Sequence, residues 1–446
     1  MSTHPLFDLL IAQALDLPLP ELTRRDLAWP QMPGKVQAIT GMRRAGKTTF
    51  LHQIMRDFQQ SGVEREGLLY LNFEDERLLG LPVADLTHFI EAYYRRCPER
   101  RGKMKSVFCF DEIQLIPGWE SFVRRLLDTE KVQIFVSGSS SRMLSREVAT
   151  SLRGRGLETT VWPFSFREFL RHRGVEPKGK AGFWPPAEVS RMEAAFQIYL
   201  HQGGFPEAQN APAALHRQLL QSYVDACLFR DVVERHNVTN LPALRSLIRQ
   251  LLASPASLFS IHKCWNDMKS QGMAVAKESL HAWLGQLEDA FLLFTLPLCT
   301  ASERQRQVNP RKVYPCDHGL IPVYDRTGRA NTGHSLETVV AVELKRRGAE
   351  LAYALTEDGG EVDFAVTQGD GSKSLIQVAA ELRDESTLDR EFRPLMPGTV
   401  FMAPGWGKAE RLLLTLDMST AIQVQTSAPK GTLVRPVWAW LLESPA

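Results

Sequence analysis

The fold is decided by residues 41–48, which read Gly41-Met42-Arg43-Arg44-Ala45-Gly46-Lys47-Thr48. They fit the phosphate-loop pattern G-x-x-x-x-G-K-[ST] and stand between an apolar run at 35–40 and a helical pattern from about 47 to 60. Glycines let backbone N–H groups turn inward around phosphates, and the start of the helix adds partial positive charge. The pattern predicts that the loop, extended to Thr49, binds a nucleotide, with Lys47 on the β- and γ-phosphates and Thr48 on Mg²⁺.

Two acids, Asp111 and Glu112, directly follow an apolar run at 106–110. A strand buried on both faces would end here, at the carboxyl edge where ligands of parallel sheets bind. Asp111 is expected to hold Mg²⁺, and Glu112 to polarise the attacking water. A glutamate directly after the metal-side aspartate is typical of P-loop proteins that hydrolyse ATP with a built-in base. The alternative is a pair of solvated acids at a strand end.

Further apolar runs at 67–73, 132–137 and 158–162 alternate with helical patterns, which predicts a doubly wound parallel α/β sheet. In the class just described an extra strand separates the two motif strands, and the strand at 67–73 leaves enough chain for that layout. The run at 132–137 leads into serines, of which Ser139 is the candidate to sense the γ-phosphate and orient water. Serines after strands also simply cap turns.

Bulk composition fits a globular protein of several domains. The 446 residues include 53 basic and 51 acidic side chains, so the net charge of +2 gives no general field for nucleic acid, and any DNA contact must rest on local patches. Six cysteines are scattered without a C-x-x-C pair, which favours reduced structural thiols over a metal site. No apolar run has the length of a membrane span, and no leader pattern precedes the loop, so we expect a cytoplasmic protein without membrane contact.

Sequence motifs along nearly the whole chain resemble a large family of bacterial and archaeal AAA-like ATPases. Beyond the phosphate loop they are Leu71-Asn72-Phe73-Glu74-Asp75, Phe110-Asp111-Glu112-Ile113-Gln114, Pro117-Gly118-Trp119-Glu120, Ser137-Gly138-Ser139, Leu152-Arg153-Gly154-Arg155, Pro163-Phe164-Ser165-Phe166-Arg167-Glu168-Phe169, Gly203-Gly204-Phe205-Pro206-Glu207, Lys312-Val313-Tyr314 and Asp317-His318-Gly319-Leu320.

This resemblance implies an AAA-like ATPase core followed by a helical segment, a winged-helix module and a small restriction-endonuclease-like α/β domain. It also implies that Arg155 is a γ-phosphate sensor or finger, because a fixed cation can neutralise charge in the transition state. A finger acting across a subunit boundary would require a homo-oligomer. The alternative is a surface arginine in a basic strip with Arg142, Arg146 and Arg153.

The expected domains follow from these patterns and from a polar, Gly- and Pro-rich stretch at 171–186. They are an N-terminal extension (1–34), the P-loop domain (35–175), a helical segment (186–240), a winged-helix module (241–325) and the C-terminal domain (333–446).

The winged-helix prediction rests on helical patterns at 241–252, 260–269 and 277–290, followed by strands at 291–298 and 313–314. Acids in the third helix would repel phosphates, so the stretch between the strands is the better DNA surface. Its candidate contacts are Arg304, Arg306, Arg311 and Lys312. A role in domain packing alone is the alternative.

In the C-terminal domain Glu337, Asp363 and Gln377 follow the order of the PD-(D/E)xK nuclease core. That chemistry needs converging carboxylates for Mg²⁺ and a lysine two residues after the last one. Gln377 is neutral and Ala379 stands where the lysine belongs, so we expect a degenerate site without nuclease activity.

The leading functional hypothesis is Mg²⁺-dependent ATP binding and hydrolysis that drives a switch or motor. It includes a DNA-directed role in genome maintenance, mobile elements or phage defence. One alternative is a nucleotide-regulated interaction module with negligible turnover, and a further alternative is an ATP-dependent nuclease. ATP is favoured over GTP because the sequence has no N-K-x-D motif.

Overall fold

The computed structural model describes residues 5–138, 154–179, 184–325, 331–382 and 384–443. The chain forms two compact units: residues 1–161 with 289–291, and residues 162–288 with 292–446. The P-loop domain was expected to reach residue 175, whereas the main stretch of the first unit ends at Val161. Ser139 lies outside the described residues, so its predicted role stays a prediction.

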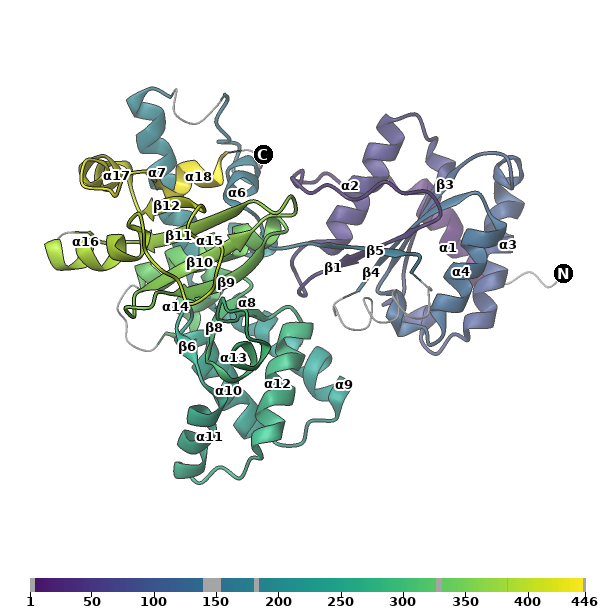
Figure 1. Ribbon diagram of the computed structural model, residues 1–446. Helices are drawn as coiled ribbons and strands as arrows, with labels where there is room; N and C mark the ends of the chain where they lie inside the picture. The colour runs from purple at the N-terminus through teal and green to yellow at the C-terminus, as the bar shows by residue number, and fades with distance from the viewer. Residues whose placement is uncertain (1–4, 139–153, 180–183, 326–330, 383, 444–446) are drawn as a thin grey trace. The chain divides into compact units, whose positions relative to one another are not determined.

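The first unit contains a five-stranded sheet, as the alternating pattern predicted (Figure 1). Its strands are β1 (Val36–Thr40), β2 (Leu68–Asn72), β3 (Ser106–Asp111), β4 (Val132–Ser137) and β5 (Gly156–Thr160). Every pairing is parallel, and the order is β2-β3-β4-β1-β5. The two motif strands, β1 and β3, are therefore separated by one strand, which is β4.

Two apolar layers enclose this sheet. On one face lie α1 (Pro5–Asp16), α3 (Leu86–Arg96) and α4 (Trp119–Thr129). The other face is covered by α2 (Lys47–Gln60) with part of the chain before β1, whose Trp29 packs on Phe135. Because alternate residues of a strand point to opposite faces, Phe108 and Phe110 join the first layer and Val107 and Cys109 the second.

The segment predicted as an N-terminal extension belongs to the first unit. Phe7 and Ile11 of α1 are fully buried in the same cluster as the sheet residues Leu69 and Phe108. The ring of Phe7 meets Phe89 of α3 edge to face, with centroids 5.8 Å apart. Burial of apolar surface, rather than local sequence signals, fixes this helix on the domain.

The second unit begins with helices α6 (Phe166–His172), α7 (Pro186–Gln202) and α8 (Ala213–Ala226), then a π-helical turn (Cys227–Val233) and α9 (Glu234–His236). A small module follows, made of α10 (Leu241–Ala253), β6 (Leu258–Phe259), α11 (Ile261–Ser270), α12 (Lys277–Asp289), β7 (Leu293–Leu296), α13 (Glu303–Val308) and β8 (Arg311–Pro315). Its antiparallel strands have the order β6-β8-β7. The stretch that the sequence analysis treated as an open wing thus carries a short helix, α13.

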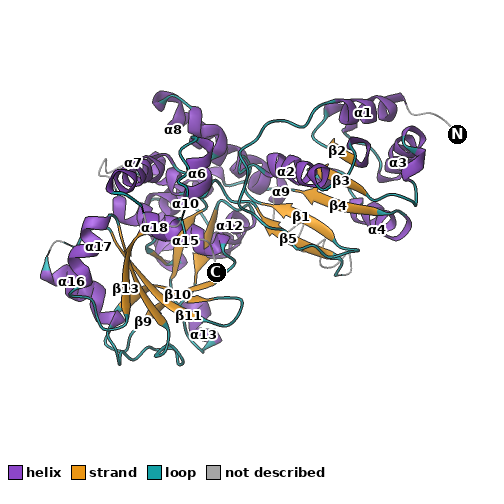
Figure 2. Ribbon diagram, turned by 90° about the horizontal axis from the view of Figure 1, so that it is seen from above, coloured by secondary structure: helices purple, strands orange, loops and turns teal. Residues whose placement is uncertain are grey.

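After α14 (Ile321–Tyr324), the rest of the chain forms α15 (Thr332–Arg346), β9 (Glu350–Leu355), β10 (Glu361–Thr367), β11 (Lys373–Ala379), α16 (Glu385–Phe392), β12 (Glu410–Thr415), α17 (Met418–Gln425), β13 (Thr432–Pro436) and α18 (Val437–Leu441). The sheet order is β13-β12-β11-β10-β9. Its first three strands in the chain pair antiparallel and its last three parallel. Helix α17 packs on β12 and β13, and Figure 2 shows it beside β13.

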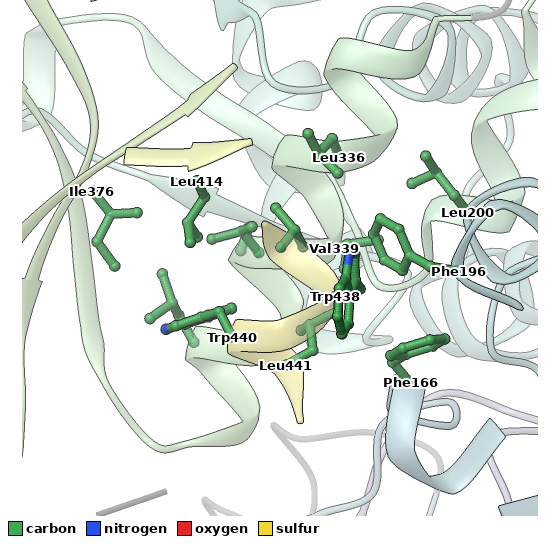
Figure 3. Close-up of a cluster of buried hydrophobic side chains, with 14 of the residues drawn as sticks. Phe166, Phe196, Leu200, Leu336, Val339, Ile376, Leu414, Trp438, Trp440 and Leu441 are labelled. Carbon is green, nitrogen blue, oxygen red and sulfur yellow. The ribbon is translucent and has the colours of Figure 1, made fainter. Parts of the chain in front are cut away.

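One hydrophobic cluster joins α6, α7, α15 and α18 to this sheet. Figure 3 shows Trp438 and Trp440 of α18 close to Val339 of α15, with Phe196 of α7 and Phe166 of α6 beside them.

No helix within the described ranges has both the length and the apolar character needed to cross a membrane.

Two sequence motifs that lie over a hundred residues apart meet at Asp317. Its carboxylate accepts hydrogen bonds from the backbone N–H groups of Gly204 (2.8 Å) and Gly319 (2.9 Å). A Cβ atom on Gly203, whose φ is +77°, would lie 2.1 Å from an oxygen of Asp317. Glycine is therefore required at this joint because no side chain fits.

Replacing Gly203 with Ala should destabilise the second unit by at least about 2 kcal/mol, since both strain and a steric clash result. The measurement is the midpoint of thermal unfolding. Gly285→Ala in α12 is the matched control, because a Cβ there meets nothing within 4 Å and should leave stability equal or higher. Equal midpoints for the two variants would contradict the packing described for Gly203.

A candidate nucleotide site at the carboxyl edge of the first sheet

The predicted phosphate loop connects the end of β1 to the start of α2. Gly41 and Gly46 have φ values of 137° and 101°, and Arg44 also lies in the left-handed region at 67°. A Cβ atom on Gly41 would lie 2.2 Å from the backbone oxygen of Val161. The loop needs glycine at these turns, and it leaves the first N–H groups of α2 without helical acceptors.

Lys47 is the first residue of α2, and its side chain is only 6% exposed. The ammonium donates to the backbone oxygens of Gly41 (3.1 Å) and Met42 (3.3 Å). It also lies 3.8 Å from Oε1 of Glu112. A buried cation held by neutral carbonyl groups is well placed to exchange them for the oxygens of a polyphosphate.

Asp111 ends β3, and its carboxylate accepts hydrogen bonds from three hydroxyl groups. Thr48 and Tyr70 each donate to Oδ2 at 2.7 Å, and Ser137 donates to Oδ1. Burial and the charge of Asp111 raise the pKa of Tyr70 well above its usual range, so the phenol remains a donor. Thr48 and Asp111 present adjacent hard oxygen atoms beside the phosphate loop, and this donor set fits Mg²⁺.

Glu112 follows with a φ of 54°, which places its backbone in the left-handed region. Burial raises the pKa of Glu112 above its ordinary value, while the Lys47 ammonium lowers it by less. Gln114 donates a hydrogen bond to Oε2 of Glu112, and the Glu112 N–H donates to Ser137 Oγ at 3.0 Å. Gln114 thus holds the carboxylate and Ser137 holds the backbone of Glu112, beside the lysine of the phosphate loop.

Two family models and several known proteins are similar to this chain. A model of the AAA domain matches residues 33–170, and a model of a domain of unknown function matches residues 193–328. An uncharacterized protein of Methanocaldococcus jannaschii is 33% identical over 377 residues, which cover 84% of this chain and 80% of that protein. The chain belongs to the same family as this archaeal protein.

Two further likenesses accompany this match. An uncharacterized protein of Haemophilus influenzae is 29% identical over 351 residues, which cover 79% of this chain and 84% of that protein. A solved Walker-type ATPase of Pyrococcus abyssi is 12% identical, with a TM-score of 0.40, over 71% of this chain and 94% of that one. The AAA-domain match and the parallel sheet together identify the first unit as an AAA-like P-loop fold.

Sequence reasoning missed two residues of the AAA domain that contact Asp111. Tyr70 lies on β2 and Ser137 at the end of β4, the neighbours of β3 on either side. The polar residue closing β4 was visible in the sequence, but the prediction chose Ser139. Tyr70 gave no signal, because a tyrosine within an apolar strand is ordinarily read as core.

Arg155 does not lie at this site. It immediately precedes β5, whose Gly156 pairs with Val36 at the start of β1, so it stands at the amino edge of the sheet. The phosphate loop follows the opposite end of β1, roughly 16 Å away at about 3.3 Å per residue. The guanidinium instead pairs with Asp128 of α4. Within one chain Arg155 therefore lies far from the phosphate loop, and its role as a γ-phosphate sensor or finger stays a prediction.

The predicted nuclease-like residues do come together in the second unit. The backbone N–H of Asp363 on β10 donates to the side-chain oxygen of Gln377 on β11 at 3.2 Å. Lys312 links Asp363 to Glu337 of α15, at 2.9 Å and 3.0 Å. Ala379, at the end of β11, is buried.

The predicted DNA contacts separate into two groups. Arg304 and Arg306 are exposed on α13, and Arg311 is half-buried at the start of β8. Lys312 is only 3% exposed and is bound to carboxylates, so its prediction as a DNA contact is wrong. Strand alternation explains the difference, because Arg311 and Lys312 point to opposite faces of β8.

Replacing Glu112 with Gln should raise the thermal midpoint of the nucleotide-free protein at pH 8, with the gain shrinking toward pH 5. Because the pKa of Glu112 is higher in the folded than in the unfolded protein, the free energy of unfolding falls as pH rises through the folded-state pKa. Glutamine does not titrate, so the variant escapes this loss. The measurement is thermal unfolding across this range. The exposed Glu76→Gln serves as control and should track wild type. A Glu112→Gln midpoint below wild type at pH 8 would contradict the effect of burial.

Proposed function

We propose that this protein binds ATP with Mg²⁺ at the loop 41–49 and hydrolyses it, with Glu112 as the base that polarises water. The observation that carries the proposal is the convergence of Lys47, Thr48, Asp111 and Glu112 at one edge of the sheet. The lysine suits the phosphates, and the hydroxyl and the first carboxylate suit the metal ion. The second carboxylate lies beside them, where it can act on water.

Each residue has a defined task in this mechanism. Lys47 leaves the carbonyl groups of its loop for the β- and γ-phosphates, and Thr48 with Asp111 would hold Mg²⁺, which screens phosphate charge. Ser137 binds both Asp111 and the backbone of Glu112, and thereby fixes the two acids relative to each other. Ser137 thus positions the two acids, which is a different task from the γ-phosphate sensing predicted for Ser139.

Glu112 also provides a physical basis for a nucleotide-driven switch. Its carboxylate is held by Gln114 and lies near Lys47, and both partners must rearrange before it can face a water molecule. Departure of Lys47 to the phosphates removes the nearest positive charge and favours that rearrangement. The same restraint favours the alternative, a nucleotide-regulated interaction protein with negligible turnover.

The test of hydrolysis is a phosphate-release assay combined with ATP binding. Lys47→Ala should bind ATP at least about a hundredfold more weakly, because the loop loses its only ammonium group. Glu112→Gln should bind ATP as wild type does and lower turnover at least about a hundredfold. If Glu112→Gln hydrolysed ATP as fast as the wild type, Glu112 would not be the base. ATP binding without measurable release in the wild type would favour the interaction protein.

A DNA-directed role is a second proposal, in which the small module of residues 241–315 acts as a winged helix. Its element order of helix, strand, two helices and two strands supports this interpretation, and Arg304 and Arg306 are exposed on α13 between the last two strands. Such a helix would contact phosphates without reading bases.

DNA binding by this helix should weaken steeply with salt, since phosphate contacts release counterions. Arg304→Glu combined with Arg306→Glu should lower affinity for duplex DNA at least about tenfold at low salt, measured by fluorescence anisotropy. The control is Lys408→Glu, a charge reversal in the C-terminal domain, which should leave affinity unchanged. Absence of binding by the wild type at low salt would end the DNA proposal.

Arg155 retains one role in the proposed reaction, as a finger that a neighbouring copy presents in a homo-oligomer. Its position at the amino edge of the sheet, partly exposed, leaves it accessible to a second chain. A specific activity that rises with protein concentration in wild type but not in Arg155→Ala would support this role.

A further inference from the structure

Lys312 of β8 ends in a cluster of acids from the C-terminal part of the second unit. Its ammonium lies 3.0 Å from Glu337 of α15, 2.8 Å from Glu361 and 2.9 Å from Asp363, both of β10. An ammonium has three N–H donors, and these three carboxylates use all of them. The cation is therefore fully coordinated by protein oxygen atoms.

The surrounding groups complete this coordination. Tyr314 donates to Glu337 Oε1 at 2.6 Å, and the backbone N–H of Val378 donates to Asp363 Oδ2 at 3.0 Å. Burial and the charge of Asp363 raise the pKa of Glu337, and the Lys312 ammonium and the Tyr314 hydroxyl oppose this rise because they stabilise the carboxylate. Without a cation between them, these buried carboxylates would repel each other strongly.

The residues do not fit the metal site of the nuclease core that the domain order resembles. That site needs a third acid and a lysine on the β11 strand, and Gln377 and Ala379 supply neither. No group of acids, histidines and cysteines among the residues described has an arrangement that could hold a metal ion. The space between Glu337 and Asp363 is taken by an ammonium group.

A lack of access from solvent does not explain why these residues do not fit a metal site. A cavity of about 700 Å³ opens beside the cluster, and Glu361, Asp363 and Gln377 are part of its lining. A hydrated divalent cation could therefore reach these oxygen atoms. What opposes its binding is the positive charge already there, together with the acids that this charge occupies.

We propose that Lys312 is a built-in cation that takes the place of a divalent metal ion between Glu337, Glu361 and Asp363. The site is thereby permanently filled and takes up neither Mg²⁺ nor Mn²⁺. The lysine comes from the small sheet of β6, β8 and β7, so the ion pairs also fasten that sheet to α15 and β10. The C-terminal domain thus uses carboxylates of the nuclease type to hold its own chain together.

Removal of the ammonium should uncover a latent site for a hard divalent cation. In Lys312→Ala the three acids lose their shared counter-ion, and we expect their side chains to turn inward around a cation, because Mn²⁺ and Mg²⁺ prefer oxygen ligands. The test is a titration of the full chain with Mn²⁺ in the absence of nucleotide. Electron paramagnetic resonance measures the Mn²⁺ that stays free. Lys312→Ala should bind one Mn²⁺ more per chain than wild type, and Lys312→Ala with Asp363→Asn should lose it.

One control variant, compared in two measurements, keeps this result specific. Lys373→Ala removes an exposed lysine from β11 in the same domain and should bind Mn²⁺ as wild type does. Mn²⁺ should raise the thermal midpoint of Lys312→Ala and leave that of Lys373→Ala unchanged. A folded Lys312→Ala protein without the extra Mn²⁺ would overturn the proposal.

The wild type provides a test that does not depend on the folding of any Lys312 variant. Wild type and Asp363→Asn should bind Mn²⁺ equally, because the proposed site holds no metal while the lysine is present. A wild-type Mn²⁺ site that Asp363→Asn abolishes would show that a metal displaces the ammonium, and the proposal would be wrong.

Discussion

The carboxylate of Asp111 is the point on which the AAA domain depends. Three hydroxyl groups donate to it, from α2, β2 and β4, so one buried side chain joins the helix after the phosphate loop to both neighbours of β3. A buried charge requires such compensation. This requirement places Thr48 beside Asp111, and it brings Ser137 to the backbone of Glu112. The geometry of the candidate site therefore follows from satisfying one acid.

The local parts of this site could be predicted from sequence, and the cross-strand parts could not. The loop 41–48 and the pair Asp111-Glu112 are contiguous motifs with fixed spacing, and the alternation of strands and helices predicted the parallel sheet. Tyr70 can contact Asp111 because it stands two residues before Asn72, which is in register with Asp111. This register depends on how the strands pair in space, which the sequence does not show. The same limit explains Lys312, whose partners lie 25 to 51 residues further along the chain.

The two lysine–carboxylate sites differ in one respect that decides what each can do. Lys47 is held by backbone oxygens and lies 3.8 Å from its nearest acid, so its bonds can be exchanged for those of a ligand. Lys312 has a carboxylate for every proton, at 2.8 to 3.0 Å. The first arrangement leaves an ammonium ready for a polyanion, and the second leaves nothing to exchange. Burial is similar in both, so the number of charged partners sets the difference.

The origin of Lys312 has a consequence for how the chain can be divided. A fragment that begins after β8 contains the helix and all five strands of the C-terminal sheet, yet it lacks the one cation at their centre. Glu337 and Asp363 would then lose the ammonium that lies between them, and their charges would oppose each other. We therefore expect a C-terminal fragment to fold stably only if it includes β8, the strand that carries Lys312.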